Sequence, residues 1–168
     1  MSTTGQASFP YWLGNYPQPM AYGSFSRNSD KTVTGANVAT PIEYDTTETA
    51  SQTYYSGSRI YVQATGTYRI FYTIQTDTSS GGQQTVTIFF RQNGVDVPRS
   101  GSLFTIQNNG ENIAACEIML PLLAGDYIEV VMLSADANMT ANYIAGGGIA
   151  PNTFPAIPAI ITTLNRIA

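Results

Sequence analysis

Polar and apolar residues alternate most regularly along residues 66–100. In segments 68–74 and 85–91, aromatic or aliphatic side chains occupy every second position, the spacing that places them on one face of a β-strand. Each segment also carries a phenylalanine on its other, polar face, at Phe71 and Phe89. A phenylalanine ring on a solvated face gains no stabilisation from burial. Either a second layer of the same chain or another subunit must therefore cover these two rings.

Short runs with the same pattern continue along most of the chain, separated by Gly, Pro, Asn and Asp residues typical of turns. Residues 46–57, rich in Thr and Ser, and residues 146–158, with three glycines and three prolines, are predicted to be loops. No segment of ten or more residues has a helical period. The spacing predicts an all-β sandwich of about eight to ten antiparallel strands. The expected strands cover residues 21–26, 39–48, 60–62, 68–74, 85–91, 103–107, 112–120, 127–133, 139–146 and 159–167.

The first 20 residues differ from the rest, because residues 9–20 contain three prolines and no charge. Proline cannot donate to a β-ladder, so residues 1–20 are predicted to form an extended arm ahead of a domain over residues 21–168. The arm is expected to bury its larger side chains on its own domain, on a neighbouring subunit or on a larger scaffold. These side chains are Phe9, Tyr11, Trp12, Leu13 and Tyr16.

The composition provides a core but few charges. Of 168 residues, 43% are hydrophobic, which is ample for one domain, whereas only 11% are charged. A surface made of Thr, Ser, Asn, Gln and Gly suits close subunit contacts or a dense assembly. The seven basic residues are scattered and outnumbered by eleven acidic ones, so no basic stripe is present to bind nucleic acid.

The chain offers little for catalysis or metal binding. It has no histidine, which excludes His-based triads and His-containing zinc sites, and its single cysteine, Cys116, cannot form an internal disulfide. Asp126 and Glu129 are three residues apart and would lie on opposite faces of a strand, and Asp126 is expected to hydrogen-bond its own turn. The acidic residues are dispersed rather than clustered as calcium requires. We expect no enzymatic activity, no metal and no cofactor.

The 11 tyrosines offer rigid, amphipathic contact area. Tyr54 and Tyr55, beside Ser56 and Gly57, are expected either to form a patch that binds carbohydrate or protein, or to be half-buried residues of the sandwich surface. Residues 1–6 do not read as the start of a signal peptide, and no apolar stretch approaches the ~20 residues that span a bilayer. We therefore expect synthesis and folding in a cytoplasm, without contact with a membrane.

Four short motifs occur in order along the chain. They are the strand opening Gly66-Thr67-Tyr68-Arg69-Ile70, the hairpin Phe90-Arg91-Gln92-Asn93-Gly94, the strand entry Leu123-Ala124-Gly125-Asp126-Tyr127-Ile128 and the apolar strand that ends the chain. In this order and spacing they resemble the tumour necrosis factor-like and complement globular-head jelly-roll superfamily. The resemblance covers roughly residues 21–168, and it implies a jelly-roll β-sandwich.

The resemblance also implies a homotrimer. Members of this superfamily are ten-strand jelly rolls that assemble about a threefold axis, and outward residues of the G-x-Y and G-D strands line that axis. Carried over to this sequence, Phe71 and Arg69 would lie near the axis, with Tyr127 and Val131 from an adjacent strand. Such an interface would cover Phe71.

The chain is more similar to jelly-roll proteins of bacteriophages and other large DNA viruses than to secreted animal ones, in its segments YGSFS, ATPIEYD and PAIPAIITTLNRI. This resemblance implies a capsid decoration (cement) protein on the virion surface, made in the host cytoplasm, whose arm binds the major capsid protein or another virion scaffold. The alternative is a receptor-binding module of a fibre or tail tip that recognises a host surface glycan or protein. The apolar arm favours the first role.

Overall fold

The computed structural model describes residues 20–107, 110–149 and 151–168, and all secondary structure in these ranges is β-strand. Within this part of the chain, ten strands have four or more residues and six have two or three. Every strand pair is antiparallel, which confirms the predicted all-β sandwich of about eight to ten strands. The arm residues Phe9, Tyr11, Trp12, Leu13 and Tyr16 lie outside the described residues.

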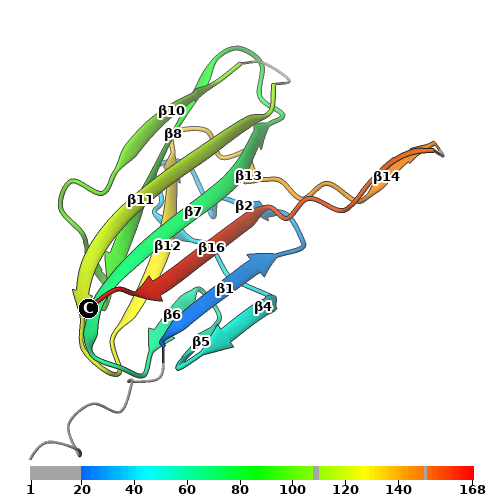
Figure 1. Cartoon of the computed structure of the whole chain (residues 1–168). Coiled ribbons are helices and arrows are strands. Elements are labelled where there is room, and N and C mark those ends of the chain that lie inside the picture. The colour runs from blue at the N-terminus through cyan, green and yellow to red at the C-terminus, as the bar shows by residue number, and fades with distance from the viewer. Residues whose placement is uncertain (1–19, 108–109, 150) are drawn as a thin grey trace, which may run out of the picture.

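Two sheets form the sandwich, and a small third sheet projects from it (Figure 1). Sheet A contains β1 (Tyr22–Arg27), β2 (Lys31–Thr32), β4 (Thr46–Ser51), β7 (Gly66–Thr78), β11 (Asn112–Leu122), β13 (Met139–Ala141) and β16 (Ile160–Arg166). Sheet B contains β3 (Thr40–Pro41), β5 (Thr53–Ser56), β6 (Arg59–Val62), β8 (Gln84–Gln92), β9 (Val95–Asp96), β10 (Ser102–Ile106) and β12 (Tyr127–Ser134). The third sheet is the hairpin of β14 (Gly147–Ile149) and β15 (Asn152–Phe154).

β7 is the central strand of sheet A, with β11 on one side and β16, then β1, on the other. Its alternation places four fully buried side chains in the core, where they meet the inward residues of β8. The rings of Tyr72 and Phe90, from the two sheets, lie 5.3 Å apart. Arg69 and Phe71 point outward, as the pattern predicts. The four inward residues of β7 are Tyr68, Ile70, Tyr72 and Ile74.

Two predicted loops are strands instead. Residues 46–57 contain β4, which pairs with β1 in sheet A, and β5, which pairs with β6 in sheet B. Thr and Tyr favour strands, and Gln52 takes the positive φ of 54° that the tight connection needs. Residues 146–158 contain the β14–β15 hairpin. Counting Gly, Pro and Ser therefore overestimated the loops, because these residues stand within paired strands: β5 with the following β6, β14 with the following β15, and β4 with the earlier β1.

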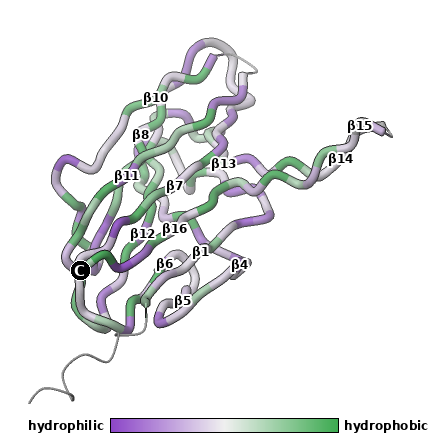
Figure 2. Tube along the Cα trace, in the orientation of Figure 1, coloured by the Kyte–Doolittle hydropathy of each residue, from purple (hydrophilic) through white to green (hydrophobic). Residues whose placement is uncertain are grey.

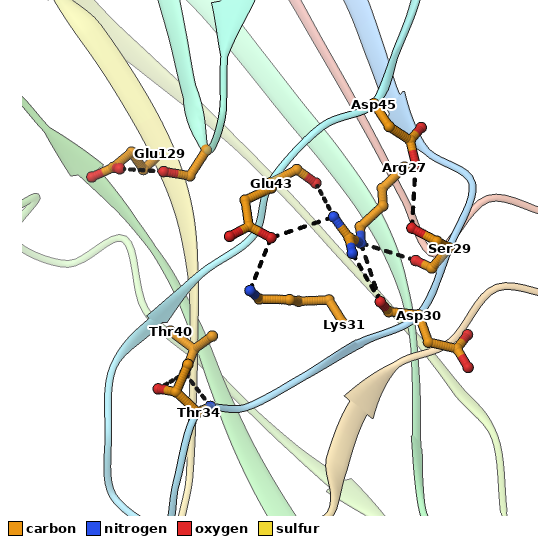
Figure 3. A network of polar contacts seen from close by, with 10 residues as sticks. Arg27, Ser29, Asp30, Lys31, Thr34, Thr40, Glu43, Asp45 and Glu129 are labelled. Atoms are coloured by element: carbon orange, nitrogen blue, oxygen red, sulfur yellow. Dashed lines mark hydrogen bonds and ion pairs between the residues drawn. The ribbon is translucent and has the colours of Figure 1, made fainter.

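A network of ion pairs ties the segment between β3 and β4, which crosses from sheet B to sheet A, to β1 and β2 (Figure 3). The Glu43 carboxylate accepts hydrogen bonds from Lys31 Nζ at 2.9 Å and from Arg27 Nη1 at 3.4 Å. Arg27 also donates to the backbone oxygens of Ser29 and Asp30. The side chains of Arg27 and Lys31 are only 16% and 18% exposed, so these contacts replace much of their hydration.

Removing the hydroxyl group from each of two buried tyrosines should change the free energy of unfolding differently. Among the described residues the Tyr72 hydroxyl has no hydrogen-bond partner, whereas the Tyr44 hydroxyl bonds Thr162 Oγ1 at 2.8 Å. Tyr72→Phe should leave the free energy of unfolding unchanged or raise it by up to about 1 kcal/mol, because no bond is lost. Tyr44→Phe should lower it by about 1 kcal/mol, because the Thr162 hydroxyl loses its partner. Urea unfolding at equal protein concentration measures both, and equal losses would contradict this account.

Candidate functional site

The outward-facing side chains of β11, β7, β16 and β1 form a broad surface that we call the outer A face. Strand register places them in three rows across the four strands. The rows are Met119–Arg69–Asn165–Tyr22, Glu117–Phe71–Thr163–Ser24 and Ala115–Thr73–Ile161–Ser26. Only Arg69 and Glu117 in these rows are charged, so the face is largely neutral.

The two charges on the outer A face neutralise each other. Arg69 Nη2 lies 2.6 Å from Glu117 Oε2, and the hydrogen bond to Glu117 raises the pKa of Arg69. The pair borders a shallow depression of about 270 Å³ together with Phe71, Thr163 and Asn165. A surface that carries its charges as a closed pair loses less hydration energy when a partner covers it than one with free charges.

Large apolar side chains remain uncovered on this side of the sandwich. The Phe71 ring is 36% exposed at the centre of the face, and Met119 on β11 is 58% exposed. Ile113, further along β11, is 67% exposed. Several exposed, large apolar side chains on one face mark a candidate site of association.

The structure brings together two of the four residues predicted for a subunit interface. Arg69 and Phe71 are neighbours on the outer A face, whereas Tyr127 and Val131 lie on β12 in sheet B. The expectation that β12 adjoins β7 is wrong, because β12 pairs with β8, β6 and β3. Alternation identifies residues on one face of a strand but not which strands are neighbours. Val131 is also fully buried within its own chain.

Tyr127 belongs instead to a row of three tyrosines on sheet B. Register pairs Tyr54 with Tyr61 and Tyr61 with Tyr127. The rings of Tyr54 and Tyr61 are stacked with centroids 5.0 Å apart, and those of Tyr61 and Tyr127 are 5.4 Å apart. Tyr54, at the edge of the sheet, is 47% exposed. Tyr55 points the other way and contacts Phe25 in the core, so of the two alternatives for Tyr54 and Tyr55 the structure does not form the joint patch, and Tyr55 is half-buried.

The buried carboxylate of Glu129 lies beside this tyrosine row, two residues from Tyr127 on β12. Glu129, with a side chain only 7% exposed, accepts a hydrogen bond from Ser58 Oγ at 2.7 Å and lies 3.7 Å from Arg59 Nε. The Arg59 guanidinium sits 4.6 Å from the centre of the Tyr127 ring, which is a cation–π contact. Tyr61 and Arg59 were missed at the sequence level. Their signal was the two-residue turn Gly57-Ser58, which places Tyr54 and Tyr61 opposite each other.

Asp126 joins two of the sequence motifs at one end of the sandwich. Its carboxylate accepts hydrogen bonds from the Leu123 backbone N–H at 2.8 Å, as expected for its own turn, and from Asn93 Nδ2 at 2.8 Å. Asn93 Oδ1 in turn accepts from the Tyr127 backbone N–H. The hydrogen bond from the Leu123 backbone lowers the pKa of Asp126 most, and the bond from Asn93 lowers it further. Together they outweigh burial, which raises it.

The Asp136 carboxylate accepts a similar set of hydrogen bonds near the other end of β7. Burial opposes its ionisation, but hydrogen bonds from Thr78 Oγ1, the Asn138 backbone N–H and Ser80 Oγ outweigh burial and lower the pKa of Asp136. Both carboxylates are fully engaged with protein donors. Among the described residues, no group of three His, Cys, Asp or Glu side chains is arranged to hold a metal ion. Nor does this part of the chain contain a helix that could span a membrane.

Comparison with known proteins identifies the fold but no family. No protein-family model and no curated protein matches the sequence. Among solved structures, the globular domain of zebrafish complement 1qA protein is 13% identical, with a TM-score of 0.52, over 87% of this chain and 94% of that one. Murine APRIL at pH 5.0 is 11% identical, with a TM-score of 0.57, over 88% and 99%. These similarities show a C1q- and tumour necrosis factor-like jelly-roll fold.

The hydrogen-bonded carboxylates of Asp126 and Asp136 predict that the protein loses stability in acid. Because folding lowers the pKa of Asp126 and Asp136, their contribution to stability is complete above the ordinary carboxylate pKa of about 4 and falls as the pH drops through the folded values. Asp126→Asn should lower the free energy of unfolding at pH 7 by about 1 kcal/mol, because Asp126 is partly exposed. It should also make the decline below pH 5 shallower in urea unfolding. If Asp126→Asn left the pH dependence of the free energy of unfolding unchanged, the assigned role of the Asp126 hydrogen bonds would be wrong.

Proposed function

We propose that this chain is a virion structural protein, a homotrimeric capsid decoration protein rather than an enzyme. The observation that carries the proposal is the outer A face, where Arg69 and Glu117 form an ion pair and Phe71 is exposed. Among the described residues, no second layer of the same chain covers this face. A C1q- and tumour necrosis factor-like fold suits association through such a face.

Attachment to the shell is assigned to the arm over residues 1–20. The described chain begins with Met20, and Ala21 accepts a hydrogen bond from the Arg166 backbone N–H, so the residue that follows the arm lies beside the end of β16. In a trimer the three arms would leave at the same end. Weak individual contacts of three arms with the major capsid protein or another virion scaffold would then reinforce one another. The virion surface is the location that this role requires.

The tyrosine row on sheet B supports the alternative, a receptor-binding module on a fibre or tail tip. Tyr54, Tyr61 and Tyr127 present ring edges and hydroxyls beside the Arg59 guanidinium. Aromatic side chains with a polar group suit a host surface glycan or protein. This row lies on the opposite sheet from the outer A face, so a trimer could bind a ligand there without losing its own interface.

A charge at Phe71 tests the interface. Phe71→Asp should raise the trimer dissociation constant about 100-fold or more, because three unpaired carboxylates would be buried near one axis. The chain should still fold, since Phe71 is already partly exposed in one subunit. Val95→Asp is the matched control, because Val95 is 70% exposed on β9 of the other sheet. Sedimentation at low micromolar concentration measures both, and a Phe71→Asp variant that stays trimeric would refute the assigned interface.

Removal of the arm separates the two candidate roles. A chain that begins at Met20 should remain a folded trimer but no longer sediment with purified virus shells that lack the native protein. Full-length Tyr54→Ala is the matched control and should still bind the shells. If the shortened chain binds shells normally, the arm is not the attachment. If Tyr54→Ala instead abolishes binding of the trimer to host cells, the receptor-binding role is the correct one.

A further inference from the structure

Two shallow depressions meet at the end of the sandwich where the described chain begins. The larger one, of about 630 Å³, lies between the start of β7, the end of β11 and the turn that follows β11. The smaller one, of about 340 Å³, is lined by Met20 and the last three residues of the chain. Because Ala168 lines both, the two depressions adjoin, and we call them together the end groove. Its residues are Met20, 65–67, 92–93, 121–123, Asp126 and 166–168.

The C-terminal residues cross the start of β7 closely and belong to both depressions. The Thr67 backbone N–H donates to the Ala168 oxygen at 2.8 Å, and the Ile167 N–H donates to the Thr67 oxygen at 2.8 Å. A Cβ on Gly66 would collide with the Ala168 backbone oxygen, so glycine at this position lets the chain end pass. Figure 2 shows the hydrophilic end of β16 followed by a short hydrophobic stretch directly before the C-terminus. The end groove is therefore a fixed part of sheet A.

Large apolar side chains line the end groove, and its charged side chains bond to protein groups. Met20 is 67% exposed, Leu123 is 64% exposed and Ile167 is 48% exposed. Asp126 accepts a hydrogen bond from the Leu123 backbone N–H, and Arg166 Nη1 donates to a backbone oxygen at 3.5 Å. An uncharged, apolar segment suits this groove, because it can cover the exposed side chains without leaving a charge unpaired.

We propose that residues 9–19 of the same chain lie in the end groove while the protein is free in solution, with the Trp12 ring in the larger depression. The segment is continuous with the groove, because residue 19 is bonded to Met20, which lines it. The eight residues back from Met20 to Trp12 can span up to about 28 Å, so Trp12 can pass the smaller depression and reach the adjoining one. The larger depression is within the range of small-ligand pockets, about 300–1,000 Å³, and can take an indole ring.

Composition and tethering select this occupant. Residues 9–19 carry no charged side chain, and three prolines restrict the segment before it docks, so less conformational entropy is lost on docking. A segment attached at the edge of a groove meets it at an effective concentration on the order of millimolar. A free partner at micromolar concentration cannot match this advantage. The apolar side chains of the segment are Phe9, Tyr11, Trp12, Leu13 and Tyr16.

The docked arm adds a step to the attachment proposed above. A virion scaffold that binds residues 9–19 must compete with the end groove, so the apolar side chains of the arm are covered in the free protein and released only to a partner. The inference does not rest on the proposed homotrimer, because the arm and the groove belong to one chain.

Trp12 reports the docking directly, because it is the only tryptophan of the chain. In the full-length protein its fluorescence should be blue-shifted, and acrylamide should quench it about threefold less than in a free peptide of residues 1–20. Leu123→Asp should return both values to those of the peptide, because a docked ring would have to desolvate the new carboxylate. This variant can fold, since Leu123 is exposed. Leu103→Asp is the matched control, because Leu103 is 69% exposed on β10 of sheet B, and it should leave both values unchanged.

A mixed oligomer separates docking on the same chain from docking on a neighbour. Chains with Leu123→Asp and the native Trp12 are co-expressed with an excess of chains that carry Trp12→Phe and a native end groove. Docking on the same chain predicts that Trp12 remains as strongly quenched as in the Leu123→Asp protein alone. Recovered protection would show that the arm lies on a neighbouring subunit, and it would overturn the proposal.

The remaining outcomes test the groove itself. Peptide-like quenching of Trp12 in the native chain would show that the arm is not docked. Protection that persists in Leu123→Asp would show that the arm docks elsewhere, and either result would overturn the proposal. Neither readout involves virus shells or the mass of the trimer, so the proposed function stands or fails by its own tests.

Discussion

β7 carries apolar side chains on both faces, and a two-sheet sandwich can bury only one of them. The inner face, with Tyr68, Ile70, Tyr72 and Ile74, meets the inward residues of β8 and forms the core. The outer face leaves Phe71 in the middle of a surface whose two charges pair with each other. The rest of the interpretation follows from this constraint, because a stable core does not require Phe71 but an association surface does.

The features outside the core are arranged around the same surface. The described chain begins beside the end of β16, and the β14–β15 hairpin joins the same sheet at the beginning of β16 (Figure 1). The two features therefore lie at opposite ends of β16. The low charge of the chain, 11% of residues, is consistent with a molecule that is covered on several sides.

The sequence predicted most of the fold because its signals are local. Alternation identified the buried face of β7, and the Asn93-Gly94 turn and the Asp126 turn were recognised separately before the structure joined them through Asn93 Nδ2. What failed was non-local. Nothing in the residues around Tyr127 says that β12 pairs with β8 rather than β7, or that β4 pairs with the earlier β1. The tyrosine row depends on such a long-range pairing, because Tyr127 meets Tyr61 only where β12 pairs with β6.

The native mass of the full-length chain at low micromolar concentration tests the central claim, that the outer A face is a self-interface. Sedimentation equilibrium reports this mass without assuming a shape. The account predicts a species with three times the 18.1 kDa of one chain, stable on dilution across the micromolar range. A single-chain mass throughout that range would show that Phe71 and its surroundings are exposed in solution, and it would contradict the account.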